Sequence, residues 1–169
     1  MTCPIAWCRQ AAAHGLASCQ LALPLALGAA GAPPSDDLPD IAAERALVYS
    51  GEFDAAVRRL DELSQTVQHA EIYNLLGYSL RQLQRYDEAA RAYQQALLLD
   101  PEHRPALEYQ GELFIATGNI HGARQNLRYL ELLCGGTGCV EYGLLGSALL
   151  EEHRAYSLHN SWAYIIFNM

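Results

Sequence analysis

The sequence contains no lysine: its eleven basic residues are all arginine, set against nineteen acidic residues, and the formal net charge is −8. A net-negative chain without a basic stripe binds phosphate backbones poorly, so we expect no nucleic-acid partner. The absence of lysine also excludes Schiff-base chemistry and the usual P-loop lysine. The length of 169 residues and the hydrophobic share of 51% fit one globular domain.

Charge is scarce at the start of the chain, because Arg9 is the only charged side chain in residues 1–32. An apolar run at residues 16–27 is followed by small residues. This order predicts a secretory signal peptide at residues 1–32 and a short linker at 33–36. We therefore expect a periplasmic or secreted protein; the alternative is a cytoplasmic protein with a disordered N-terminus. The apolar run is too short for a membrane span, so we expect none in the mature chain.

Cysteine is also scarce after this segment, where Cys134 and Cys139 flank a glycine-rich stretch. In an oxidising compartment this pair can form a disulfide across the flexible loop, whereas in the cytosol it would be two free thiols. The spacing is not the two-residue spacing of thioredoxin-like sites. No metal-ligand spacing, phosphate-binding loop or nucleophile arrangement is evident, so we predict no catalytic residue, no cofactor and no metal site.

An internal repeat is the most informative pattern that is present. The interval from Gly77 to Gly111 equals the interval from Ala89 to Ala123. Within residues 70–103 the apolar and small residues recur at helical spacing on two successive segments, and a proline stops the second. These repeat-defining residues are Tyr73, Leu76, Gly77 and Leu80 on the first helix and Ala89, Tyr93, Ala96 and Pro101 on or after the second.

At these residues the sequence resembles the tetratricopeptide repeat family, whose pattern of aromatic, leucine-glycine, apolar, alanine, aromatic, alanine and proline it meets at every offset. A weaker copy follows at 104–137, and a degenerate one precedes at 37–69. The resemblance implies an all-α fold, a right-handed solenoid of about three helical hairpins plus a C-terminal capping helix, at residues 37–156. Small residues such as Gly77 are expected to let the two helices of a hairpin approach closely, while neighbouring hairpins bury each other's apolar faces.

Two positions depart from this pattern. In the first copy Glu44 stands in place of the glycine, so we expect that hairpin to pack less closely. In the last copy Gln110 replaces the apolar residue that precedes Gly111.

The predicted capping helix begins at Val140 and ends near Tyr156. Its apolar side is expected to carry Tyr142, Leu145, Leu149 and Leu150. The remaining residues, 157–169, form an apolar tail without formal charge. Three interpretations of this tail stay open: it folds back over the last helix, it docks a partner, or it results from a reading-frame change.

The resemblance also implies a function, since proteins of this family are generally adaptors whose first helices line a groove for a partner peptide or helix. By this similarity the partner-binding candidates are Arg45, Tyr49, Glu71, Asn74, Tyr78, Arg81, Gln82, Glu108, Glu112 and Ile115. Aromatic and arginine side chains are common interface anchors. We therefore expect a protein–protein interaction scaffold that is not an enzyme and that binds another protein or a peptide. The alternatives are a cytosolic adaptor or co-chaperone, and a small redox protein or hydrolase that uses Cys134 and Cys139.

Overall fold

The computed structural model describes residues 39–136 and 138–167, with side chains as far as residue 155. The described residues form seven α-helices and no strand. The helices are α1 (Ala42–Tyr49), α2 (Phe53–Ser64), α3 (Ala70–Gln82), α4 (Tyr86–Leu99), α5 (Arg104–Ala116), α6 (Ile120–Leu133) and α7 (Val140–Phe167). The prediction of an all-α fold is thus confirmed. The predicted signal peptide and linker lie outside the described residues.

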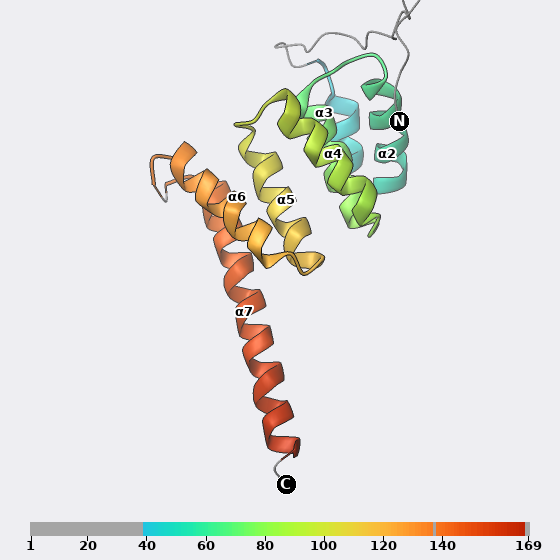
Figure 1. Ribbon diagram of the computed structural model, residues 1–169. Coiled ribbons are helices and arrows are strands. Elements are labelled where there is room, and N and C mark those ends of the chain that lie inside the picture. The colour runs from blue at the N-terminus through green and yellow to red at the C-terminus, as the bar shows by residue number, and fades with distance from the viewer. Residues whose placement is uncertain (1–38, 137, 168–169) are drawn as a thin grey trace, which may run out of the picture.

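The first six helices pair into three hairpins, α1 with α2, α3 with α4 and α5 with α6, which stack in chain order (Figure 1). The odd-numbered helices are neighbours, since α1 contacts α3, α3 contacts α5 and α5 contacts α7. They therefore form one layer of the stack, here called the inner layer. Among the described residues, the even-numbered helices do not form such a layer, because α2 does not contact α4 and α4 does not contact α6. The arrangement agrees with three hairpins plus a final helix, and the right-handed sense of the solenoid stays a prediction.

Each hairpin turns at a residue with left-handed backbone geometry. These residues are Gly51, Gln84 and Gly118, with φ of 79°, 59° and 78°. Glycine adopts this region freely, whereas a side chain there costs roughly 1–2 kcal/mol. The turn of the middle hairpin therefore carries backbone strain that the other two lack.

Two inner-layer helices begin at histidines that occupy equivalent places in successive repeats. His69 Nδ1 accepts a hydrogen bond from the N–H of Glu71 at 3.1 Å, and His103 Nδ1 accepts one from the N–H of Ala106 at 3.2 Å. A side-chain acceptor at this position satisfies an amide that the helix itself leaves unpaired. The caps fix where α3 and α5 begin, and so they set which side chains face inward.

Close packing at the repeated glycines has two different forms. A Cβ added at Gly77 would lie 2.7 Å from the ring of Tyr93, a fully buried residue of the same hairpin. A Cβ added at Gly111 would lie 2.5 Å from Leu145, which belongs to α7. Glycine therefore permits a close approach at both places. The expectation that glycine lets the two helices of its own hairpin approach is right for Gly77, whereas Gly111 makes room for Leu145 of α7.

The two positions that depart from the repeat pattern are accommodated by polar partners. Glu44 is buried, and its Oε1 lies 3.2 Å from Arg59 Nη2 on α2. Gln110 is buried as well, and its Oε1 accepts a hydrogen bond from Asn126 Nδ2 at 3.0 Å. A buried polar group costs little free energy once it is hydrogen-bonded, so neither substitution interrupts the stack.

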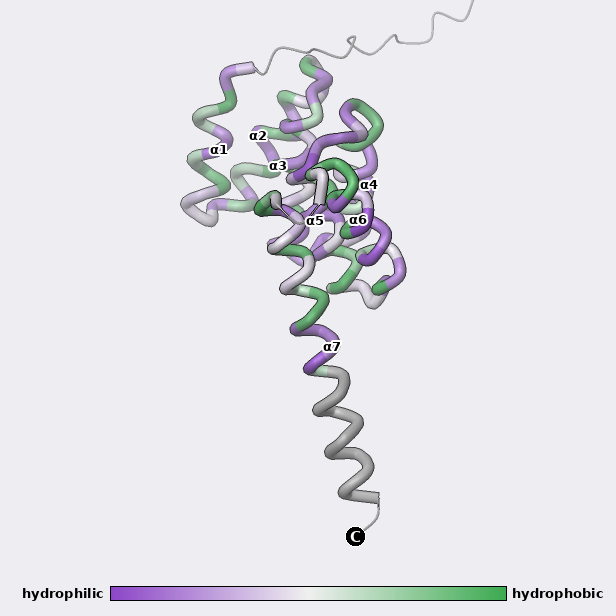
Figure 2. The backbone as a smooth tube through the Cα atoms, turned by 90° about the vertical axis from the view of Figure 1, so that its left-hand side faces the viewer, coloured by the Kyte–Doolittle hydropathy of each residue, from purple (hydrophilic) through white to green (hydrophobic). Residues whose placement is uncertain are grey.

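The last helix differs from the capping helix expected from the sequence. It continues past Tyr156 to Phe167 and extends beyond the stack (Figure 1), and in Figure 2 the coloured part of α7 already leaves the other helices. Leu145 is fully buried, but Leu150 is 63% exposed, so its place on the packed side was wrongly predicted. Five residues of helix rotate a side chain by about 140° relative to Leu145, because one turn holds 3.6 residues. None of the described helices is both long enough and apolar enough to cross a membrane.

Candidate partner-binding groove

A half-buried carboxylate, that of Glu71, ties three helices of the inner layer together. Its Oε1 lies 2.8 Å from Arg45 Nη2 on α1, and its Oε2 accepts from Asn74 Nδ2 at 3.0 Å. His103, at the start of α5, places Nε2 3.3 Å from the same Oε2. Although burial alone would raise the pKa of Glu71, hydrogen bonds from His103, Asn74 and Arg45 outweigh it and hold that pKa below its usual value. The residue is therefore an anion at neutral pH that fixes its neighbours.

Aromatic rings follow along the same face. The rings of Tyr78 on α3 and Tyr109 on α5 have centroids 5.0 Å apart, and Phe53 on α2 meets Tyr78 edge-on at 6.2 Å. The Arg81 guanidinium lies 5.5 Å from the Tyr78 centroid and 5.9 Å from that of Tyr109, within the range of cation–π attraction. Burial, with the charge of Glu108 beside it, raises the pKa of Tyr109 to about 12. Its hydroxyl is therefore protonated at neutral pH and can donate a hydrogen bond.

Between these two groups the inner layer is hollowed. The aromatic hollow has a volume of about 240 Å³ and is lined by Val48, Tyr49, Glu71, Asn74, Leu75, Tyr78, Pro105 and Tyr109. Asn74 is only 2% exposed, and while its Nδ2 donates to Glu71, its Oδ1 has no hydrogen-bond partner among the described residues. A buried acceptor without a partner costs about 1–3 kcal/mol. The hollow is thus lined by a buried amide, a carboxylate and the tyrosines Tyr49, Tyr78 and Tyr109.

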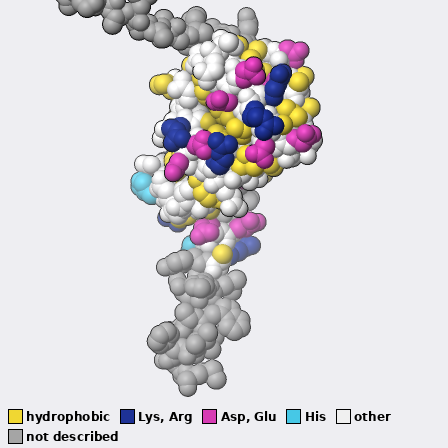
Figure 3. Space-filling model, turned by 90° about the vertical axis from the view of Figure 1, so that its right-hand side faces the viewer, with side chains coloured by type: hydrophobic (Ala, Val, Ile, Leu, Met, Phe, Trp, Pro, Cys, Tyr) yellow, Lys and Arg dark blue, Asp and Glu magenta, His cyan; other side chains and the backbone are white. Residues whose placement is uncertain are grey.

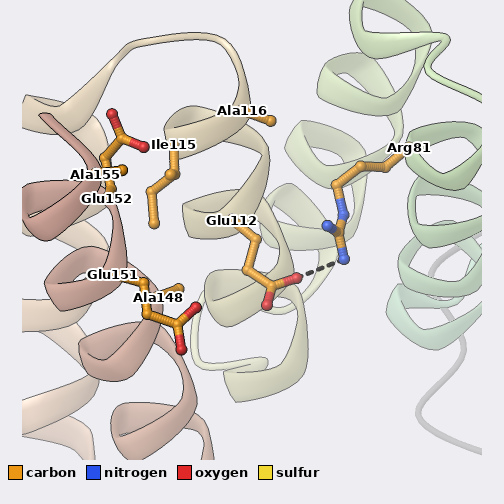
Figure 4. A pocket seen from close by; sticks show the side chains of 8 residues that line it. All are labelled: Arg81, Glu112, Ile115, Ala116, Ala148, Glu151, Glu152 and Ala155. Atoms are coloured by element: carbon orange, nitrogen blue, oxygen red, sulfur yellow. Dashed lines mark ion pairs between the residues drawn. The ribbon is translucent and has the colours of Figure 1, made fainter. Parts of the chain in front are cut away.

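A second depression, the acidic hollow, lies farther along the inner layer and has a volume of about 390 Å³. Figure 4 shows Arg81 of α3 reaching to Glu112 of α5, with which it forms an ion pair, and side chains of α7 on the opposite side. The lining residues are Arg81, Glu112, Ile115, Ala116, Ala148, Glu151, Glu152 and Ala155. Three carboxylates and one arginine, itself paired, leave this hollow acidic.

Glu108 lies beneath this face and is 2% exposed. Burial, together with the nearby carboxylate of Glu112, raises the pKa of Glu108 to about 8. Two carboxylates one helical turn apart cannot both ionise cheaply in a partly buried place, so Glu108 holds a proton at neutral pH. It acts there as a neutral hydrogen-bonding group and not as an anion.

The structure brings most of the candidate residues together. Tyr49, Glu71, Asn74 and Tyr78 line the aromatic hollow, and Arg81, Glu112 and Ile115 line the acidic one. Arg45 supports the first hollow through its ion pair with Glu71. Gln82 lines neither hollow, and Glu108 is too buried to present its side chain to a partner directly.

Two residues of this face were missed from the sequence, His103 and Tyr109. His103 lies at the start of α5, and Tyr109 lies about 100° around that helix from the predicted candidate Glu108. Their signal is the internal repeat. His103 is the counterpart of His69 in the next repeat, and Tyr109 is the counterpart of Leu75, which also lines the aromatic hollow.

Another face of the molecule has a different character. In Figure 3, arginine and acidic side chains alternate among apolar ones, without a broad area of one charge on that face. Among the described residues, no group of three or more His, Cys, Asp or Glu side chains could hold a metal ion. The Cα atoms of Cys134 and Cys139 lie 5.7 Å apart, a separation that a disulfide can bridge.

The comparison with protein families matches one segment of this architecture. Residues 70–103, which span α3, α4 and the loop before α5, match the model described as tetratricopeptide repeat. This segment is a tetratricopeptide repeat. It contributes Glu71, Asn74, Tyr78 and Arg81, the residues on which both hollows are centred. The hairpins on either side of the repeat lie outside the match and share its helix–turn–helix geometry. The comparison with curated proteins found no match.

Proposed function

We propose that the protein is an interaction scaffold, and that the inner layer of α1, α3 and α5 holds a segment of a partner protein. The tetratricopeptide repeat supports the scaffold role, since proteins built from such repeats present concave surfaces to other proteins. The observation that carries the proposal is the aromatic hollow. Three tyrosines, Tyr49, Tyr78 and Tyr109, line this hollow together.

The chemistry of this hollow fits a polypeptide better than a small metabolite. Tyrosine rings supply contact area at a small cost in conformational entropy, and their hydroxyls can form hydrogen bonds with a peptide backbone. The paired charges around it, Arg45 with Glu71 and Arg81 with Glu112, are held by ion pairs and so form a rigid frame. A preorganised frame lowers the free-energy cost of ordering a bound segment.

Peptides selected from a random display library on the immobilised full chain provide the test. Tyr49 is 82% exposed, so Tyr49→Ala removes a groove contact without opening the core. We expect this change to weaken the selected peptides by about tenfold, the effect of losing roughly 1.4 kcal/mol of contact. The matched control is Tyr129→Ala, at a partly exposed tyrosine of α6 outside the inner layer. Equal affinity of Tyr49→Ala and the wild type, or an equal loss in both variants, would disprove the groove as the binding surface.

We further propose that the protein is exported and that Cys134 and Cys139 are joined by a disulfide. The order of the N-terminal residues and the separation of the two Cα atoms support this pair of proposals. The intact mass of the protein isolated from its own cells should be lower than that of the full chain by the mass of about 30 residues, the usual upper size of a signal peptide. A full-length mass would favour the cytosolic adaptor instead.

A further inference from the structure

The first turns of α7 repeat the residue pattern of α3. An aromatic, a leucine-glycine pair and a further leucine occur in both helices at the same intervals. The α7 helix contacts α5 and α6, as α5 contacts α3 and α4. It therefore occupies the place of the first helix of a fourth hairpin. The corresponding residues are Tyr142, Leu145, Gly146 and Leu149 in α7 and Tyr73, Leu76, Gly77 and Leu80 in α3.

The place of the second helix in this fourth hairpin is open. In the complete repeat the ring of Tyr93 fills the space beside Gly77, 2.7 Å from where a Cβ would stand. Beside Gly146, the only described side chain within 4 Å of such a Cβ is Leu127, at 3.8 Å. A glycine in the middle of a helix costs about 1 kcal/mol relative to alanine, and here no described second helix uses the space that it leaves.

The chain does not turn back to fill this space. The earlier hairpins turn at Gly51, Gln84 and Gly118, the last two of which lie seven residues after Gly77 and Gly111. The residue seven positions after Gly146 is His153, and α7 passes through it as helix to Phe167. At a rise of 1.5 Å per residue, the residue sixteen positions after Gly146 lies about 24 Å farther along the helix. A straight α7 therefore carries its own second half out of reach of Gly146.

The sequence of that second half fits the open place. Trp162 follows Gly146 by sixteen residues, as Tyr93 follows Gly77, whereas the larger Leu158 and Ile165 stand where the complete repeat has Ala89 and Ala96. Residues 157–167 contain no charged residue, so covering them removes no ion from water.

We propose that residues 157–167 of one copy occupy the place of the second helix beside α7 of a second copy, with Trp162 against Gly146. The exchange is reciprocal and closes a two-fold dimer, the form that swapping of one element produces. It gives both copies a complete fourth hairpin and covers their apolar tails. It also holds α7, whose Glu151 and Glu152 line the acidic hollow. The dimer does not depend on what the groove binds.

The test is the molar mass of the full chain in solution, measured by light scattering over a wide range of protein concentration. We expect a dimer whose dissociation constant rises at least about tenfold in Gly146→Leu, because the new side chain takes the space of Trp162. Within one copy a Cβ added at Gly146 meets only Leu127, at 3.8 Å, so helix content by circular dichroism should stay unchanged. The matched control is Gly138→Leu, in the loop before α7 with no atom within 4 Å of the added Cβ, which should stay dimeric.

A second variant covers the case in which Gly146→Leu disturbs folding. Trp162→Ala leaves the three hairpins untouched and should also be monomeric where the wild type is dimeric. A monomeric wild type at every concentration would overturn the proposal. So would a dimer that is indifferent to Gly146→Leu and Trp162→Ala.

Discussion

Replacing Gly77 by valine tests the packing on which the repeat depends. The Cβ of the new side chain would lie 2.7 Å from Tyr93 Cε1 and 2.8 Å from its Cδ1, closer than real Cβ contacts allow. Tyr93 is fully buried, so its ring cannot move aside into solvent. Overpacking of a tight core typically costs about 1–3 kcal/mol, and the gain in helix propensity over glycine recovers only about 0.5 kcal/mol. We expect Gly77→Val to lower the free energy of unfolding by about 2 kcal/mol.

The assay is urea denaturation followed by far-ultraviolet circular dichroism. Gly143→Val is the matched control, because a Cβ added at that helical glycine meets no atom within 4 Å. It should change stability by no more than about 0.5 kcal/mol. Combining Gly77→Val with Tyr93→Leu should cost less than the sum of the single changes, by about 1 kcal/mol or more, since the two residues are in contact. Equal stability of the two valine variants, or strict additivity in the double mutant, would refute the close approach of α3 and α4.

Three further predictions concern a buried acid, a strained turn and the cysteine loop. Because the pKa of Glu108 is raised to about 8, the folded protein binds more protons than the unfolded chain above the usual pKa of 4.5, so stability falls as pH rises between these values. Glu108→Gln should therefore be more stable than the wild type at pH 8.5, by roughly 1–3 kcal/mol, and similar to it near pH 4. Denaturation at both pH values measures this, and the same difference in stability at both would contradict the raised pKa. Gln84→Gly should stabilise the middle hairpin by about 0.5 kcal/mol in thermal unfolding, because relief of the positive φ of 59° exceeds the added freedom of the unfolded chain, and a loss of stability would contradict the strain. Thiol titration of the unfolded, unreduced protein should find Cys134 and Cys139 blocked, and replacing both by serine should cost about 2 kcal/mol; two free thiols on exported protein would exclude the disulfide.

The complete repeat could be predicted from sequence because its signal is local. Tyr73, Gly77, Ala89 and Tyr93 stand at offsets that only a close helical pair requires, and the family match covers the same residues. The inner faces of α3 and α5 follow from these offsets by helical periodicity. Most of the groove candidates could therefore be placed before any coordinates were known.

The rest depends on contacts between elements that are distant in sequence. Nothing near Gly111 indicates that Leu145 of α7 fills the space beside it. The ion pairs of Glu71 likewise join Arg45 and His103 across two hairpin boundaries. The sequence did not predict the full length of α7. This helix has no glycine like Gly118, which marks the turn after α5, and a missing turn residue does not show where a helix ends.

The central claim, that the inner layer binds a partner segment, is tested most directly by nuclear magnetic resonance. Isotope-labelled protein is titrated with a peptide selected on the wild type, and backbone amide shifts are mapped on the helices. We predict that the largest changes fall on α1, α3 and α5, around Tyr49, Asn74 and Tyr78. Changes confined to α2, α4 and α6 would contradict the account.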